Sequence, residues 1–579
     1  MLAEVLARYV LDAPLTWTAE LAGFVLVWVV MLGITLGVRE GSHYGVQLLA
    51  NRLPARPRVA AEAVRDAATI GFFLVMAWEG FQAMRVNGDI SSSVLNIPLS
   101  WIYLAFVVSG VIGAVNAINR IAHHATRPAR AIATALVIIA VMATLLVVFY
   151  VSETLILPVV LVTAVVLLVV GTPIAIVIGM SVMVGIQLTR LASLEIAVEQ
   201  MFNAIDNFTL IAVPFFMLTG TILLETRLAD RLIDFAMILV GRSRGGLAYV
   251  DIVASCLFAD ISGSSTSDTA AIGSTMIPGM AAAGYRREFA TGLQAASGSM
   301  GMLVPPSTCT IIYATVAGVS VLDMFAASIL PALLMACSFA LVVFWYARRS
   351  GLPKGPRIGI RDAVHKLRRA ILPLLTPVII LAGIFSGAIT AAEAGAVAVA
   401  YSVLAAAGSR SLSRQNGSRA LATGTRNFSI VFFVISTAML LSYVLSYEQI
   451  PQSVARITLG LSSKAIIVLL MIMVVMVVIH TVLEAVATIL IVTPIFVPPL
   501  MEMGVSPIHF GVLLMMNSSI GLILPPIGLC LYISSAIGKV PIERAAKAVI
   551  PFASVIACDL VILIVFPQIS TVVPHLLGR

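Results

Sequence analysis

A polar island interrupts an apolar segment between residues 246 and 285. Six of the seven residues from 262 to 268 carry a hydroxyl or a carboxylate, and the seventh, Gly263, permits a tight chain reversal. In lipid such a run must face protein or a water-filled cavity, because unsatisfied backbone groups are costly there. Its oxygens suit a hard cation or an anionic substrate, and the charge of Asp268 favours Na⁺. Helix packing by small residues is the alternative. The candidate ligands at this tip are Ser262, Gly263, Ser264, Ser265 and Asp268.

Two other apolar segments are each broken by a Pro-Pro pair, at 305–306 and at 525–526. Each pair removes two N–H donors, and the glycine before it leaves the backbone adaptable. The freed carbonyl groups can coordinate a cation, and the N-termini of the half-helices can attract an anion. A kinked packing helix is the alternative for either break. The candidate residues are Gly298, Gly301, Pro305, Pro306 and Ser307 in the first break and Gly521, Pro525 and Pro526 in the second.

Three further polar residues lie in or beside apolar segments. Glu484 is at the centre of a second, less polar tip, residues 479–488, where a functional role and a structural salt bridge are both open. His480 could relay protons, but a lone histidine in an apolar segment is more often packed and hydrogen-bonded. Glu393 lies near a short connection, where a functional role is also open but a solvated loop carboxylate is favoured.

The two broken segments belong to a repeat with a constant offset of 220 residues. Between residues 278 and 331 nine positions are identical at that offset, and seven of the nine are glycine or proline. The repeat therefore conserves mainly the positions at which glycine or proline changes the backbone conformation. Paired Gly/Pro breaks in corresponding apolar segments indicate the binding site of a secondary transporter. The identical positions are Pro278, Gly284, Leu293, Ser299, Gly301, Pro305, Pro306, Gly318 and Pro331.

The composition indicates a polytopic helical membrane protein. Hydrophobic residues make up 60% of the chain and charged residues 11%, whereas a soluble domain carries about 25% charge. The net charge of +8 is typical of basic cytoplasmic loops and does not suggest nucleic acid. The five cysteines lack metal-ligand spacing, and no P-loop or hydrolase pattern is apparent, so we expect no enzyme.

The charged loops predict the topology. Reading 246–285 and 464–503 as re-entrant hairpins places 29 of the 35 Lys and Arg residues in segments that all face the cytoplasm. Those segments are 39–65, 120–130, 227–244, 286–287, 348–369, 408–426 and 539–547. The predicted spans are 19–38, 66–86, 96–119, 131–152, 153–170, 172–190, 207–226, 287–318, 324–347, 370–386, 389–407, 427–446, 508–538 and 541–568.

This count implies an inverted repeat. The first unit has five spans and a hairpin that enters from the cytoplasm, so the second unit is inverted and its hairpin enters from the other side. Residues 1–130 have no partner in the repeat and form a separate module. The predicted organisation is a small module at 1–130, a connecting helix at 131–152, the first repeat at 153–347, a basic cytoplasmic linker at 348–369 and the second repeat at 370–568.

Several motifs together resemble a known family. The runs FADISGSS (258–265), GSMGMLVPPS (298–307), TAAEAGAVAVAY (390–401), IVTPIFVPPL (491–500), HFG (509–511) and GLILPPIG (521–528) are similar to the large M subunit of TRAP (tripartite ATP-independent periplasmic) transporters. RYVLDAPLTWTAEL (8–21), with Trp28, Gly33, REG (39–41) and His43, resembles the small Q subunit. The chain therefore looks like a fused Q–M membrane component.

The resemblance implies Na⁺-driven uptake of a small organic acid across the bacterial inner membrane. A separate periplasmic binding protein would deliver the substrate, and no cofactor beyond the coupling Na⁺ is expected. The repeated module would divide into a scaffold, braced by the Q part, and a moving elevator that carries the hairpins, the breaks and the ion sites. Na⁺ would lie at Ser264, Ser265, Gly301 and Gly521. A Q subunit has a full helix before these motifs, whereas seven residues precede Arg8, so we expect a shortened first helix or an earlier start.

Two alternatives remain open. One is a Na⁺- or H⁺-coupled carboxylate carrier of elevator type that works without a binding protein, although such a carrier does not need the Q-like module. The other is an ion channel built on re-entrant loops. A transporter accumulates its substrate against a gradient only with the coupling ion, whereas a channel never does.

Thiol labelling of single cysteines tests the topology. We expect Arg286→Cys to react only from the cytoplasm and Gly504→Cys only from the periplasm, because the Lys/Arg distribution places the two hairpins on opposite sides. Labelling of both positions from the same side would overturn the inverted repeat and the placement of the transport site that depends on it.

Overall fold

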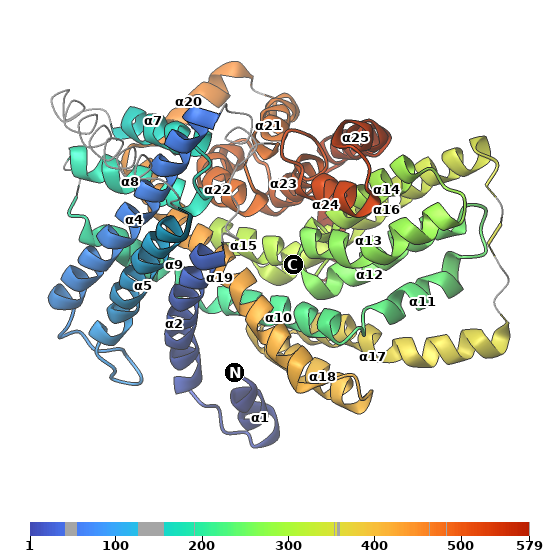
Figure 1. Ribbon diagram of the computed structural model, residues 1–579, viewed down its shortest axis with the longest axis horizontal. Helices are drawn as coiled ribbons and strands as arrows, with labels where there is room; N and C mark the ends of the chain where they lie inside the picture. Colours follow the sequence, from blue (N-terminus) through green and yellow to red (C-terminus); the bar gives the residue numbers. More distant parts are fainter. Residues whose placement is uncertain are drawn as a thin grey trace. The chain divides into compact units, whose positions relative to one another are not determined.

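The computed structural model of the chain is all-α in the residues that it describes (Figure 1). These are residues 1–40, 55–124, 156–189, 192–352, 354–355, 359–462, 464–481 and 483–577. Ten of the described helices are long and apolar enough to cross a membrane. The connecting helix expected at 131–152 lies outside the described residues.

The helices divide into two compact units. The smaller unit comprises residues 6–211 and 425–453, and the larger unit comprises 1–5, 212–424 and 454–579. α1 (Leu2–Val10), α19 (Arg414–Tyr447) and α20 (Ile450–Leu461) each contribute residues to both units. The other helices of the smaller unit are α2 (Trp17–Glu40), α4 (Ala55–Val86), α5 (Ser100–His124), α7 (Ile156–Val169), α8 (Ile174–Thr189), α9 (Glu195–Ile205) and the 3₁₀ helix η1 (Phe208–Ile211).

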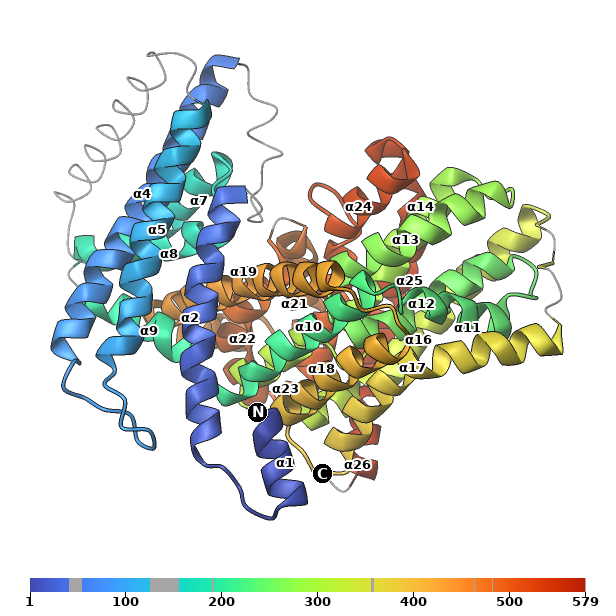
Figure 2. The ribbon, with the colours of Figure 1, turned by 60° about the horizontal axis from the view of Figure 1, so that its bottom comes forward.

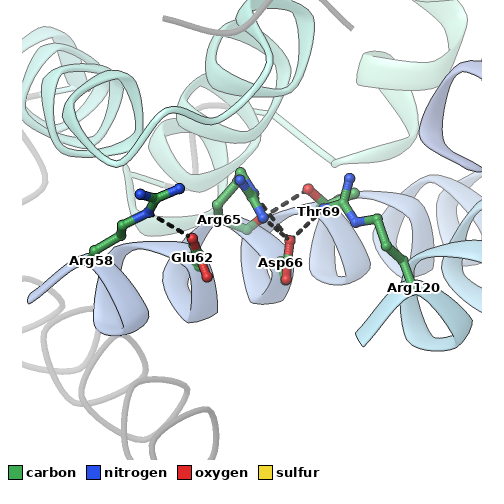
Figure 3. Close-up of polar contacts among 6 residues, drawn as sticks. All are labelled: Arg58, Glu62, Arg65, Asp66, Thr69 and Arg120. Atoms are coloured by element: carbon green, nitrogen blue, oxygen red, sulfur yellow. Dashed lines mark hydrogen bonds and ion pairs between the residues drawn. The ribbon is translucent and has the colours of Figure 1, made fainter. Parts of the chain in front are cut away.

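Aromatic rings form the core of the smaller unit. Phe72 and Phe73 of α4 and Phe433 of α19 are fully buried, with ring centroids 5.5–6.4 Å apart. α4 and α5 lie side by side (Figure 2). An ion-pair cluster joins them, because Asp66 of α4 contacts both its neighbour Arg65 and Arg120 of α5 (Figure 3). These charged residues lie near the ends of the two candidate spans, Ala61–Val86 and Ser100–Arg120.

The larger unit contains two helix pairs and two broken helices. After residues 1–5, it continues with α10 (Ala212–Glu225) and α11 (Asp230–Val240). The first pair is α12 (Gly246–Ser262) with α13 (Ser265–Ala282), and the first broken helix is α14 (Arg287–Ser299), the 3₁₀ turn η2 (Met300–Met302) and α15 (Thr308–Ala317). α16 (Val321–Arg349), α17 (Ile360–Phe385) and α18 (Ala391–Gly408) follow. The second pair is α21 (Ala465–His480) with α22 (Ala485–Glu502), the second broken helix is α23 (Pro507–Gly521) with α24 (Leu529–Gly538), and α25 (Ile542–Val565) and α26 (Gln568–Leu576) close the chain.

The helices agree with the sequence prediction wherever a long apolar run or a Gly/Pro break defines them. Both expected hairpins are helix pairs, and both Pro-Pro segments separate two helices. The short helices α9, α11, α20 and α26 were not predicted, because each is too short or too polar to register as an apolar span. Part of the linker expected at 348–369 is helical, since α17 begins at Ile360.

The structure also indicates a better position than Gly504 for the cysteine that tests the topology by thiol labelling. Gly504 has a φ of 79°, a left-handed conformation that a cysteine would strain. Glu502 is exposed at the end of α22, two residues earlier. Glu502→Cys is therefore the better cysteine for the same side of the membrane.

Candidate functional site

The first hairpin tip is a short reversal between α12 and α13. Gly263 has a φ of 57°, a left-handed conformation that glycine adopts without steric cost. The Oγ of Ser264 then caps α13 by accepting a hydrogen bond from the backbone N–H of Ser267 at 3.5 Å. Ser262 ends α12, and its side chain lies outside the described part of the chain. The polar island therefore caps α13 in addition to supplying candidate oxygen ligands.

Two polar side chains of this tip are buried against the first break. Ser265 is 4% exposed and Asp268 is 0% exposed. A Cβ atom added at Gly301 would lie 2.7 Å from Asp268 Oδ2 and 3.1 Å from Ser265 Oγ. The absence of a side chain at Gly301 therefore lets the break approach the carboxylate. Asp268 also lies in the first turn of α13, where the helix dipole favours negative charge.

Hydrogen bonds fasten this tip to the segments beyond both breaks. Thr308, the first residue of α15, donates from Oγ1 to the carbonyl oxygen of Gly263 at 2.6 Å. Cys530, in the first turn of α24, donates from Sγ to the carbonyl oxygen of Ser265 at 3.6 Å. Within the first break, Ser307 Oγ donates to the carbonyl oxygen of Met302 at 2.9 Å. The backbone groups that the tip and the break release are thereby satisfied in part by side chains.

The two breaks touch at a pair of equivalent residues. Ser519 Oγ donates to the carbonyl oxygen of Ser299 at 3.0 Å, and these serines are 220 residues apart. Residues equivalent in a two-fold repeat can contact each other only near its axis. The predicted repeat and this contact are therefore mutually consistent, and the contact lies between the two candidate break regions.

The second hairpin tip is also capped, but by a carboxylate. Glu484 accepts hydrogen bonds from the backbone N–H groups of Val486 and Ala487 at 3.1 and 3.4 Å. It is the N-cap of α22, a role that neither sequence alternative for this residue included. At the 220-residue offset Glu484 corresponds to Ser264, which caps α13. The two repeats therefore cap equivalent helices with different chemistry.

His480 ties the second tip to the helix before the second break. Its Nδ1 lies 2.9 Å from Asn517 Oδ1 and its Nε2 lies 2.8 Å from Ser518 Oγ. Asn517 donates its amide to the carbonyl oxygen of Met473 at 2.8 Å, so its own carbonyl faces the histidine. The histidine is thus packed and hydrogen-bonded, as the sequence favours.

Gly521 allows the second break to lie close to the second hairpin tip. We call the contact between a tip and the break of its own repeat a junction. A Cβ atom at Gly521 would lie 2.7 Å from the backbone carbonyl oxygen of His480. Beyond the break, the N–H of Ile527 donates to the carbonyl oxygen of Thr481 at 3.3 Å. Each tip therefore lies against the break of its own repeat. Each hairpin's second arm also packs on the short helix beyond the other break, α13 on α24 and α22 on α15.

The two breaks differ in their surroundings. Pro305 and Pro306 are buried, whereas Pro525 and Pro526 are exposed. The Pro305–Pro306 and Pro525–Pro526 peptide bonds are both cis. Gly298 faces Thr269 of α13, one turn beyond the tip residue Ser265. Most of the site residues predicted from sequence thus gather at the first tip and first break, Glu484 and Gly521 lie at the second, and the second proline pair is exposed.

Several residues at this site were missed or misread from sequence. Thr308 and Asn517 make the bonds described above, but single polar residues in apolar helices gave no distinguishing signal. The expectation that Glu393 is solvated is wrong, because it is 0% exposed and forms a capping box with Thr390 at the start of α18. The T-x-x-E spacing of a capping box was readable in the sequence.

Comparison with known proteins decides the family. The model of the tripartite ATP-independent periplasmic transporter DctM component matches residues 161–569, and the model of the DctQ component matches residues 1–127. This chain belongs to the TRAP transporter family. It is a fused Q–M membrane component, because relatives named as single permease proteins align with nearly all of it.

Three relatives illustrate the match. The C4-dicarboxylate TRAP transporter large permease protein DctM of Pseudomonas aeruginosa is 38% identical over 66% of this chain and 89% of its own length. The isethionate TRAP transporter permease protein DctMQ of Oleidesulfovibrio alaskensis is 30% identical over 96% of this chain and 88% of its own. The sialic acid TRAP transporter permease protein SiaT of Haemophilus influenzae is 28% identical over 100% and 96%. Among solved structures, the YdaH transporter of Alcanivorax borkumensis covers 61% of this chain and 84% of its own at 16% identity, with a TM-score of 0.44.

Family membership and the ten apolar helices together give the location. The chain is a multi-pass protein of the bacterial inner membrane. Its relatives are transporter permeases, so its chemistry is binding and transport.

The contact between Gly521 and His480 predicts an intolerant glycine. We expect Gly521→Ala to lower the thermal unfolding temperature in detergent, because the new methyl group meets backbone that cannot rotate away, at a cost of about 1–3 kcal/mol. Gly279→Ala is the matched control, since a Cβ atom there meets nothing within 4 Å in α13. Equal unfolding temperatures for the two variants would contradict the described junction.

Proposed function

We propose that this TRAP protein imports a small organic acid by Na⁺ symport, with the substrate delivered by a separate periplasmic binding protein. The observation that carries the proposal is the first junction, where Ser265 and Asp268 are buried against the side-chain-free backbone of Gly301. A buried carboxylate beside a buried hydroxyl group and glycine backbone is an environment that suits a hard cation.

The proposed Na⁺ ligands fall at both junctions. Ser264, Ser265 and Gly301 belong to the first, with Asp268 supplying the charge, and Gly521 belongs to the second. The second junction offers the carbonyl groups of its broken helix together with the His480 network. We therefore propose that the first site depends more on side-chain oxygens and the second more on Glu484 and backbone carbonyl groups.

The substrate class follows from charge and from the relatives. The helices beyond both breaks, α15 and α24, begin beside the tips, and helix N-termini attract anions. The relatives are named for C4-dicarboxylate, isethionate, sialic acid and 2,3-diketo-L-gulonate. An organic anion bound between the two junctions is the common chemistry. In the elevator mechanism that we propose, the hairpins and broken helices would carry it across the membrane.

Reconstitution in liposomes tests this function. We expect a panel of organic acids to include one that accumulates only with an inward Na⁺ gradient and the binding protein encoded beside this protein. Uptake under a pH gradient alone in Na⁺-free buffer would contradict Na⁺ symport. Full uptake without the binding protein would favour the carrier alternative, and equilibration without accumulation would favour the channel.

The first junction is tested by removing single ligands. We expect Asp268→Asn and Ser264→Ala each to slow Na⁺-dependent uptake at least tenfold while the protein still reaches the membrane, because each change removes an oxygen ligand or a cap and alters the packing volume little. Asp362→Asn is the matched control, an exposed aspartate in the first turn of α17. Wild-type rates and unchanged Na⁺ dependence in both variants would exclude the first hairpin as the ion site.

A further inference from the structure

A polar cavity of about 790 Å³ adjoins the first hairpin tip within the larger unit. Three segments of the chain contribute to its wall: the end of α10 with the turn that follows it, the first two turns of α13, and the region where α18 connects to α19. Its polar lining residues are Glu225, Thr226, Arg227, Ser267, Ser411, Asn416 and Arg419.

α13 separates this cavity from the proposed ion site. Ser265 and Asp268 face Gly301, whereas Ser267, Ala270 and Ala271 line the cavity. Successive residues of an α-helix are 100° apart, so the two sets occupy different faces of the same helical turns. A group that leaves the tip on the side of Ser267 therefore enters the cavity directly.

The cavity carries net positive charge at its wall. Arg227 and Arg419 are exposed, and Glu225 is partly buried. Both arginines belong to basic segments, 227–244 and 408–426, that the charge distribution of the sequence places in the cytoplasm. The cavity thus combines contact with the transport site, a predicted cytoplasmic position and guanidinium groups suited to carboxylates.

The backbone conformation at Arg227 does not require an arginine side chain. Arg227 has a φ of 57°, and its N–H and that of Leu228 bond to the carbonyl oxygens of Leu224 and Leu223, closing the end of α10. Glycine is the favoured residue at such a left-handed cap, and another residue costs about 1 kcal/mol. The backbone conformation therefore does not select arginine, and glycine is a structurally compatible replacement at this position.

We propose that this cavity is the cytoplasmic exit of the transport path and that Arg227 and Arg419 bind the carboxylate of the departing substrate. This inference rests on the proposed function, because it assumes an organic anion at the hairpin tip. The two arginines come from segments almost 200 residues apart in sequence, and the cavity brings both to one wall.

The charge of the cavity is measurable without a substrate. Ala270 is exposed in the cavity wall, so Ala270→Cys can be labelled after the exposed Cys337 and Cys558 are replaced by serine. We expect labelling from the cytoplasmic side, with an anionic methanethiosulfonate reagent favoured over a cationic one. Removing one nearby positive charge should lower the anionic-to-cationic rate ratio by about fivefold.

Arg227→Gly is the decisive variant, because glycine suits the left-handed backbone and the fold is expected to survive. Arg410→Gly is its matched control: Arg410 is exposed, has a φ of 54° and lies in a basic segment, but it is outside the cavity lining. We expect Arg227→Gly to lower the rate ratio and to slow Na⁺-dependent uptake about tenfold, with Arg410→Gly leaving both unchanged. Arg419→Ala, compared with the exposed Arg414→Ala on the same helix, should behave like Arg227→Gly.

Three outcomes would overturn the proposal. One is labelling of Ala270→Cys only from the periplasmic side, and another is an equal rate ratio in Arg227→Gly and Arg410→Gly. The third is unchanged uptake in both Arg227→Gly and Arg419→Ala. The rate ratio needs no transported acid, so a failure of the proposed function appears separately, as absence of Na⁺-driven uptake in the unsubstituted protein.

Discussion

A helix that breaks inside a membrane must find partners for the backbone groups that it releases, because lipid offers none. This constraint organises the larger unit. The carbonyl oxygen of Gly263 accepts a bond from Thr308, that of Thr481 accepts one from Ile527, and that of Ser299 accepts one from Ser519. Each of these bonds joins a tip to a break or one break to the other. Satisfying the backbone therefore also holds the candidate binding groups together, and the loss of one partner would leave a carbonyl group buried and unpaired.

The same architecture is built twice with different side chains. Ser264 and Glu484 occupy equivalent positions and cap equivalent helices, so the local backbone requirement is shared. The acidic group is not shared, because Asp268 corresponds to Thr488, whose hydroxyl donates to the carbonyl oxygen of Glu484 within its own helix. Each tip therefore carries one carboxylate, but at a different position, so the two junctions can hold two ligands of different kinds. A duplicated fold thus supplies the geometry, and substitutions at a few positions supply the chemistry.

Sequence reasoning recovered the features that depend on backbone chemistry or on long apolar runs. Gly263, Gly301 and the Pro-Pro pairs were readable because glycine and proline act through the backbone alone. It did not recover the contacts of His480 with Asn517 and Ser518, because their partners lie 37 and 38 residues apart and no spacing rule connects them. Short helices such as α11 also escaped detection. Their stability comes from packing against neighbouring helices, which an apolar-run criterion does not register.

The position of α13 explains how ion binding and substrate release can be coupled under the proposed function. Asp268 and Ser265 on one face meet the first break, and Ser267 on another face meets the cavity. Coupling requires that each ligand prefers one of two arrangements of a shared element. A rigid helix that carries ion ligands on one face and lines the exit on another is such an element. Any movement of α13 that accompanies loss of Na⁺ would alter the cavity wall. Under the proposed function, the release of Na⁺ and the release of substrate would therefore be linked through this one helix.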